Sequence, residues 1–222
     1  MKEYDAYLFD ADGTIINTRE LIYRCFVHAG EKVRVAIPSR EFVNSKTGLP
    51  VGTHLRELIG YDHPEELYEE AIRHYVDYQL TVFPDYLEAF PGVVEGLAAL
   101  RGMGKKLAVV TSRRRHSLVT FLDALKIKEY FDVLVTPEDT EKHKPDPAPA
   151  LFALRALGAE PSRAIFIGDA EFDIRSGNAA GTATAYVDWG GEEYTKWPVR
   201  PDFVAHEFRD LLPDGKEEGA CA

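Results

Sequence analysis

The sequence has few cysteines and no long apolar run. Only two cysteines, Cys25 and Cys221, occur among its 222 residues, so we do not expect a disulfide framework. No apolar run approaches the ~20 residues of a membrane-spanning helix, and residues 1–5 show no signal peptide. We therefore expect a cytoplasmic protein that has no membrane partner.

Positive charge is also scarce. The chain has 26 Lys and Arg residues against 37 Asp and Glu residues, which gives a net charge of −11 at pH 7. This balance argues against nucleic acids and anionic membranes as partners. An anionic substrate would need local help from a metal ion, a lysine or an arginine. The hydrophobic content of 45% is ordinary for a soluble globular protein, and the length suits one large domain or one and a half.

Short apolar strands alternate with helices over most of the chain. The patterns predict strands over 6–9, 106–111, 132–136, 164–168 and 183–187, and helices over 93–103, 115–125, 147–157 and 174–180, with a last helical turn at 208–212. Continuously apolar strands that alternate with helices indicate a parallel sheet with helices on both faces. The predicted fold class is therefore α/β.

The region between residues 17 and 85 differs from the rest of the chain. It contains no convincing strand between Glu31 and Pro84, and its spacing predicts helices over 18–30, 39–44, 50–59 and 63–81. We interpret residues 17–85 as an inserted helical subdomain, called the cap below. Residues 1–16 and 86–222 would then form the core.

The segment from Tyr7 to Ile16 places two acids directly after a buried strand. Asp10 and Asp12 follow the strand, and Gly13 permits a sharp turn. The two side chains share one side only if the chain stays extended to Asp12; if it turns, the backbone carbonyl of Asp12 becomes available as a ligand. The alternative interpretation is a capped strand end with two solvated acids. Ligands of open α/β sheets bind at such strand ends.

Other predicted strands also end in polar residues. Thr111 and Ser112 follow one strand, Asp169 follows another with Asp173 one turn later, and Lys144 precedes a helix. Because parallel strands end at one edge of the sheet, these side chains would surround one cavity. Each taken alone has an ordinary structural explanation, such as a helix N-cap or a solvated lysine.

This set of side chains suits phosphoryl transfer. Asp10 and Asp169 are ligands of the kind that Mg²⁺ binds together with a substrate phosphate. Lys144 and the amides near Thr111 and Ser112 can hold phosphoryl oxygens, the amides helped by a helix N-terminus. An ionised Asp10 can act as a nucleophile and form an aspartyl-phosphate.

In these motifs the sequence resembles the haloacid dehalogenase-like hydrolase superfamily. The motifs are residues 10–14 (DADGT), the strand that ends in Thr111-Ser112, residues 144–146 (KPD) and residues 168–173 (GDAEFD). The resemblance implies a Rossmann-like core, Mg²⁺, Asp10 as nucleophile and Asp12 as general acid and base. It also implies that Asp10, Asp169 and the backbone carbonyl of Asp12 hold the metal with support from Asp173. Thr111 and Lys144 would bind the phosphoryl group.

Within the superfamily, the acid at Asp12 favours a phosphatase over a dehalogenase. Residues 12–22, 109–112, 143–147 and 201–203 resemble the phosphoglycolate phosphatase and pyrophosphatase group. The expected activity is Mg²⁺-dependent hydrolysis of a small phosphorylated metabolite, either a phosphomonoester such as phosphoglycolate or pyrophosphate. One alternative is a β-phosphoglucomutase-type phosphotransferase, although Ile22 stands where that branch has a cap histidine. The other is a receiver-type phospho-acceptor domain, which the cap and Asp12 argue against.

One cap loop carries a candidate for substrate recognition. Residues 45–48 combine two hydroxyls, the cation Lys46 and a flexible glycine. A substrate enclosed under the cap would need its remote end recognised from the cap, so we expect Lys46 to meet a distal anion. The alternative is a solvated surface lysine.

Overall fold

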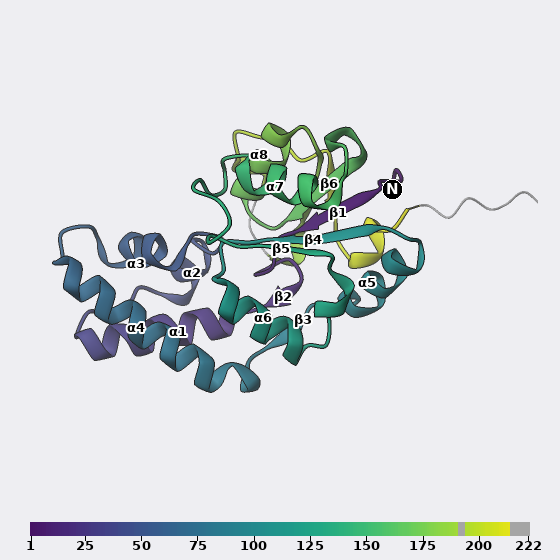
Figure 1. Ribbon diagram of the computed structural model, residues 1–222. Coiled ribbons are helices and arrows are strands. Elements are labelled where there is room, and N and C mark those ends of the chain that lie inside the picture. Colours follow the sequence, from purple (N-terminus) through teal and green to yellow (C-terminus); the bar gives the residue numbers. More distant parts are fainter. Residues whose placement is uncertain (191–193, 214–222) are drawn as a thin grey trace, which may run out of the picture.

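The computed structural model describes residues 1–190 and 194–213, and its centre is a parallel sheet of six strands (Figure 1). Their order is β5-β4-β1-β6-β7-β8. The strands are β1 (Ala6–Phe9), β4 (Lys106–Val110), β5 (Val133–Val135), β6 (Ala164–Gly168), β7 (Ala183–Val187) and β8 (Phe203–Ala205). After β1 the chain adds β4 and β5 on one side of it, and then β6, β7 and β8 on the other side. The carboxyl end of β1 is therefore a topological switch point, where open α/β sheets bind ligands.

Strand β1 is buried on both faces, which explains why all four of its residues are apolar. Ala6 and Leu8 belong to one hydrophobic cluster, whereas Tyr7 and Phe9 belong to the other. Successive side chains of a strand point to opposite faces, so each cluster fills one side of the sheet. The predicted α/β class with helices on both faces is thus confirmed.

Helices cover the two faces of the sheet in pairs. Figure 1 shows α7 (Ala148–Leu157) and α8 (Glu171–Ala180) above the sheet, and α5 (Val93–Gly102) and α6 (Arg115–Ala124) below it. Phe208, in the short 3₁₀ helix Phe208–Leu211, stacks on Phe9 of β1 with ring centroids 5.8 Å apart. The predicted last helical turn lies at this position.

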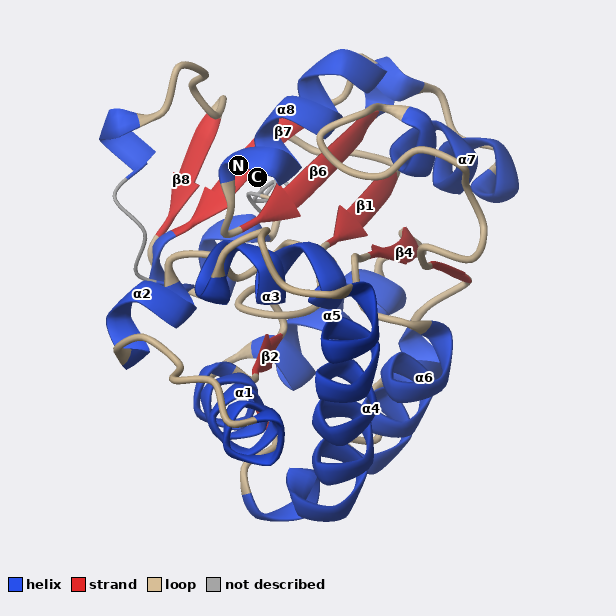
Figure 2. Cartoon of the chain, turned by 90° about the vertical axis from the view of Figure 1, so that its left-hand side faces the viewer, coloured by secondary structure: helices blue, strands red, loops and turns tan. Residues whose placement is uncertain are grey.

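Four further helices form a separate group beside the sheet (Figures 1 and 2). They are α1 (Arg19–Val33), α2 (Arg40–Asn44), α3 (Val51–Ile59) and α4 (Glu65–Val82). The long helices α1 and α4 lie side by side and bury Phe26 against Tyr75, with ring centroids 4.7 Å apart. Nothing in this arrangement fixes the exact limits of the cap, and the division at residues 16/17 and 85/86 stays a prediction.

The sequence patterns missed three short strands. Strands β2 (Ile16–Asn17) and β3 (Glu88–Ala89) pair antiparallel where the chain leaves the sheet for the helices and returns. Strand β8 adds a sixth parallel strand to the sheet. Helix α8 begins at Glu171, three residues before the predicted start. Strands of two or three residues are too short to show an alternating pattern.

Two expectations from composition can be compared with the described residues. Cys25 is buried and free, while Cys221 lies outside the residues that the structure describes. Within the described ranges, no helix combines the length and the apolar character that crossing a membrane requires.

Candidate active site

The loop after β1 makes a tight turn that places Asp10 and Asp12 at the sheet edge. The amide of Asp10 continues the ladder by donating to Ile167 O at 2.9 Å, and the amides of Ile15 and Ile16 both donate to Ala11 O. The chain therefore does not stay extended to Asp12. Of the two geometries considered from the sequence, the turn is the one observed.

Gly13 is required at this turn for two reasons. Its φ of +86° is in the left-handed region, which other residues rarely adopt. A Cβ atom at this position would lie 2.0 Å from Oδ2 of Asp169. The glycine thus lets the turn approach the carboxylate, and the next residue, Thr14, donates its hydroxyl to Oδ1 of Asp169 at 3.1 Å.

Asp10 is part of a buried network with Lys144 and Asp173. The Lys144 ammonium lies 2.6 Å from Oδ1 of Asp10 and 2.6 Å from Oδ1 of Asp173. Burial raises the pKa of Asp10 to about 7, and the Lys144 charge acts in the opposite direction. Burial by itself would lower the pKa of Lys144, but the charges of Asp10 and Asp173 raise it above its usual value. Lys144 is therefore a cation at neutral pH.

Three buried carboxylates form a candidate cation site. Oxygen atoms of Asp10, Asp169 and Asp173 all lie within 4.8 Å of one another. Three carboxylates offset by one ammonium leave an excess of negative charge in a buried place, which a divalent cation would balance. Carboxylate oxygens are also the ligands that Mg²⁺ prefers. The donor set therefore fits the expected metal.

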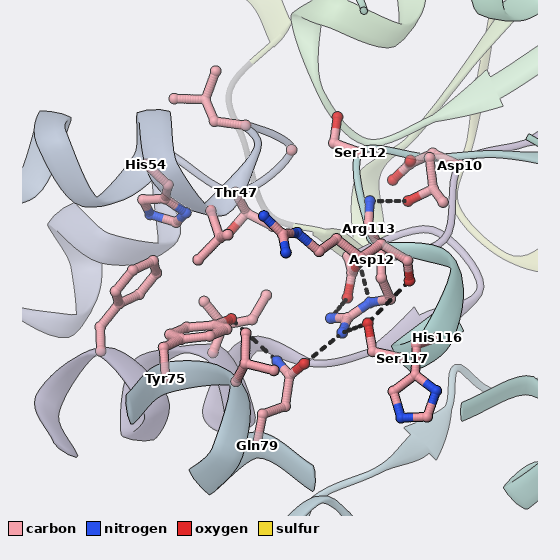
Figure 3. Close-up of a pocket in the computed structure, with 18 of the residues that line it drawn as sticks. Asp10, Asp12, Thr47, His54, Tyr75, Gln79, Ser112, Arg113, His116 and Ser117 are labelled. Atoms are coloured by element: carbon pink, nitrogen blue, oxygen red, sulfur yellow. Dashed lines mark hydrogen bonds and ion pairs between the residues drawn. The ribbon is translucent and has the colours of Figure 1, made fainter. Parts of the chain in front are cut away.

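Asp12 is held by a buried arginine that the sequence patterns did not single out. Arg113 donates from Nε to Oδ2 of Asp12 at 2.9 Å and from Nη2 to Oδ1 at 2.5 Å. The Thr18 hydroxyl also donates to Oδ1. From its other side, Arg113 donates to Oε1 of Gln79, on helix α4, at 3.0 Å. One guanidinium thus connects the acid at the end of β1 to a helix of the cap (Figure 3).

A cavity of about 310 Å³ lies between the sheet edge and helices α1, α3 and α4. From the sheet side it is lined by Asp10, Asp12, Thr111, Ser112 and Arg113. Lys144, Asp169 and Asp173 do not line it, but they contact or surround Asp10, which does. The structure therefore brings every predicted core site residue to one place, as parallel strand ends require.

The cap side of this cavity is mainly apolar. Its lining residues from the helices and the α2–α3 loop are Ile22, Phe26, Leu49, Val51, Tyr75, Val76 and Leu80, together with Thr47, Gly48, His54 and Gln79. His54 is buried, and its Nε2 lies 2.9 Å from Val43 O. Burial lowers its pKa to about 4, so His54 adds no positive charge at neutral pH. An apolar wall excludes water and strengthens the electrostatic interactions inside.

Lys46 is not brought to the cavity. Its ammonium lies 3.3 Å from Oε2 of Glu57 on helix α3 and 5.6 Å from the ring centroid of Phe42. The neighbouring residues Thr47 and Gly48 do line the cavity. Substrate binding by Lys46 stays a prediction, and this geometry does not favour it.

Sequence reasoning missed two arginines, Arg113 and Arg114, that line the cavity. The signal was the run of three arginines directly after Thr111-Ser112. The run itself gives no indication of which side chain turns inward.

Comparison with known proteins agrees with the motifs. Residues 7–187 match the family model described as haloacid dehalogenase-like hydrolase. The chain is 37% identical over 209 residues to the pyrophosphatase PpaX of Bacillus cereus, covering 93% of this chain and 94% of the relative. It is 35% identical over 212 residues to PpaX of Halalkalibacterium halodurans, covering 95% and 96%.

Solved structures share the fold at lower sequence identity. A predicted phosphoglycolate phosphatase from Haemophilus somnus superimposes with a TM-score of 0.86 at 24% identity, covering 95% of this chain and 97% of that one. A β-phosphoglucomutase from Clostridium difficile superimposes with a TM-score of 0.80 at 20% identity, covering 94% and 93%. At these identities the likeness concerns the fold alone.

Proposed function

Because the chain belongs to the haloacid dehalogenase-like hydrolase family and is a phosphatase, we propose that it hydrolyses a small phosphomonoester or pyrophosphate through an aspartyl-phosphate on Asp10, with Mg²⁺ as cofactor. The observation that carries the proposal is the placement of Asp10. It lines the cavity while its other side contacts Lys144 within the carboxylate cluster. Pyrophosphate is included because the relatives are named pyrophosphatases.

In the first step, a carboxylate oxygen of Asp10 attacks the phosphorus atom, and the bond from phosphorus to the leaving oxygen breaks. Lys144, Thr111 and Ser112 bind phosphoryl oxygens in this proposal. The buried ammonium of Lys144 also favours the ionised form of Asp10, and it offsets negative charge as the phosphoryl group arrives. Asp12 gives a proton to the leaving oxygen.

In the second step, a water molecule attacks the phosphorus atom and Asp12 takes its proton, which releases Asp10 and inorganic phosphate. The ion pair with Arg113 fixes the orientation of the Asp12 carboxylate that accepts the proton in this step. Arg113 is thus a positioning residue, which acts through Asp12.

The metal would be held by Asp10, Asp169 and the backbone carbonyl of Asp12, with Asp173 in support. When bound, a divalent cation supplies positive charge to the phosphoryl oxygens and offsets the charge of the carboxylates. Asp173 is itself fixed, because its Oδ1 accepts from Lys144 and its Oδ2 accepts from the Ala170 amide at 3.1 Å.

Turnover tests this proposal against the alternatives. With Mg²⁺ present, the protein should release many equivalents of p-nitrophenolate from p-nitrophenyl phosphate, and a panel that includes phosphoglycolate and pyrophosphate should identify the preferred substrate. Release that stops at one equivalent would indicate a phospho-acceptor domain instead. Isomerisation of a sugar phosphate without net phosphate release would indicate the mutase-type activity.

A further inference from the structure

Three consecutive arginines at the start of helix α6 have different environments. Arg113 binds Asp12, and Arg115 donates from Nη2 to Oδ2 of Asp139 at 2.5 Å. Arg114 lies between them, is exposed, and lines the cavity that contains Asp10. Within residues 1–190 and 194–213, its side chain makes no hydrogen bond or ion pair. Burial opposes the lowering of the Glu138 pKa, hydrogen bonds led by that of Thr136 produce it, and the charge of Arg114 adds to it, but Arg114 and Glu138 form no ion pair.

Arg114 also occupies the N-cap position of α6, a helix of ten residues. The helix dipole adds partial positive charge at this end. Arg113, the other arginine that lines the cavity, is already neutralised by Asp12, and Lys46 is paired with Glu57. Two arginines and no lysine line the cavity among the described residues, and of these two Arg114 is the one whose charge is not already paired.

A second, independent observation at the cavity, a buried hydroxyl without a hydrogen-bond partner, also indicates a polar ligand. The Thr47 hydroxyl has no hydrogen-bond partner, although the residue is only 7% exposed. Across the described residues, the other buried side-chain atoms without a partner belong to Tyr7, Arg19 and Asn44, none of which lines this cavity. Figure 3 shows Thr47 on the cap side, facing the region of Asp12 and Ser112 across the cavity. A buried hydroxyl of this kind is costly unless a ligand satisfies it.

We propose that Arg114 and Thr47 form a subsite for a second anionic group on the leaving-group side of the substrate. The substrate class would be a small phosphate compound with two anionic ends, either a diphosphate or a phosphorylated carboxylic acid. One end lies at Asp10 and Lys144, and the other end accepts hydrogen bonds from the guanidinium of Arg114 and the hydroxyl of Thr47. This inference depends on the proposed function. It assigns recognition of the distal group to the core residue Arg114 in place of the cap residue Lys46.

The test compares Arg114→Ala with the unsubstituted protein on pyrophosphate, phosphoglycolate and p-nitrophenyl phosphate. A hydrogen bond to a charged group implies a loss of about tenfold to a hundredfold in kcat/KM for the substrate with two anionic ends. The loss for p-nitrophenyl phosphate should be much smaller, because its distal group carries no full negative charge. Thr47→Val should reduce kcat/KM for the same substrate by a smaller factor, and Arg114→Lys should retain part of the activity.

Arg155→Ala is the matched control. Arg155 is an exposed arginine in the last turn of α7 and does not line the cavity, so the same change in net charge should leave all three rates unaltered. A selective loss on pyrophosphate would identify a diphosphate, and a selective loss on phosphoglycolate would identify a carboxylate.

Three results would overturn the subsite. They are an Arg114→Ala enzyme unchanged on both doubly anionic substrates, an equal loss on all three substrates, and a selective loss produced by Lys46→Ala but not by Arg114→Ala. In each case the proposed function survives if Asp10→Asn abolishes turnover. If the unsubstituted protein with Mg²⁺ hydrolyses none of the panel, the proposed function itself fails.

Discussion

Arg113 donates hydrogen bonds to both carboxylate oxygens of Asp12, and the side chains of the two residues are only 6% and 11% exposed. The pair joins the loop after β1 to the loop after β4. Gln79 extends it into the cap, and the Gln79 amide in turn donates to the Tyr75 hydroxyl at 3.2 Å. The position of helix α4 and the orientation of the acid are therefore connected through one guanidinium.

Replacing Arg113 with methionine should reduce both stability and activity. Removal of one partner leaves Asp12 as an uncompensated buried charge, which costs about 3–5 kcal/mol in known cases. The free energy of unfolding from urea denaturation measures the first effect, and kcat measures the second. Arg113→Lys should recover only part of each, because an ammonium cannot bind both oxygens as a guanidinium does.

The double variant Arg113→Met with Asp12→Asn is the control for stability. Because it removes both charges, it should be more stable than Arg113→Met alone. Such a difference in unfolding free energy would reveal a coupling between the two sites. Strictly additive losses would mean that the ion pair contributes nothing to the folded state.

The convergence of the core site could be predicted from the sequence, because it follows from topology. Asp10, Thr111 and Asp169 each follow an apolar segment that reads as a parallel strand, and such strands end at a common edge. The Asp12–Arg113 pair could not be predicted in this way. Which of three adjacent arginines turns inward depends on the exact backbone path between β4 and α6.

The cap was less predictable than the core for a similar reason. Its helices show a clear apolar period, so their existence could be predicted. The contact that Lys46 makes with Glu57, eleven residues later on helix α3, depends on the path of the loop between α2 and α3. The strands β2 and β3, with two residues each, left no period to detect.

Binding of Mg²⁺ should raise the melting temperature of the protein, and EDTA should abolish turnover until a divalent ion is restored. A ligand that binds only the folded state stabilises it, by about 2.7 kcal/mol at a hundredfold excess over Kd. Asp169→Asn should remove most of this thermal shift. Asp62→Asn, which removes one exposed acid of the cap, should keep it. An Asp169→Asn protein with the full thermal shift would contradict the metal assignment, as would failure of every divalent ion to restore activity.

His54 should make the stability of the protein depend on pH between about 6.5 and 4. Burial lowers its pKa to about 4 in the folded state, so over this range the unfolded chain binds the extra proton. Stability is therefore fully present above the unfolded pKa near 6.5 and falls as pH decreases toward 4. The expected loss between pH 7 and pH 5 is about 2 kcal/mol.

His54→Gln tests this assignment, because glutamine can still donate to the Val43 carbonyl but does not titrate. The difference in unfolding free energy between pH 7 and pH 5 should be smaller in the variant by the amount that His54 contributes. An identical pH dependence in the two proteins would show that another group is responsible.

Asp12→Asn should slow turnover by about 10²–10⁴-fold, the usual contribution of a general acid–base group. The loss should be larger for an alkyl phosphate than for p-nitrophenyl phosphate, since p-nitrophenolate leaves without a proton. Measured kcat values for the two substrates decide the point. Equal losses would contradict the acid role of Asp12 and leave only its role as a base.

The central claim is that the phosphoryl group passes through Asp10. Asp10→Asn is nearly isosteric, so it should retain the fold and lose turnover, but trapping the intermediate tests the claim most directly. The protein is mixed with substrate and Mg²⁺, denatured rapidly, and treated with borohydride, which reduces an aspartyl-phosphate to homoserine. Peptide mass spectrometry should then find homoserine at position 10, only when substrate and Mg²⁺ are both present. Active turnover with unmodified Asp10 in every sample, together with an active Asp10→Asn variant, would contradict it.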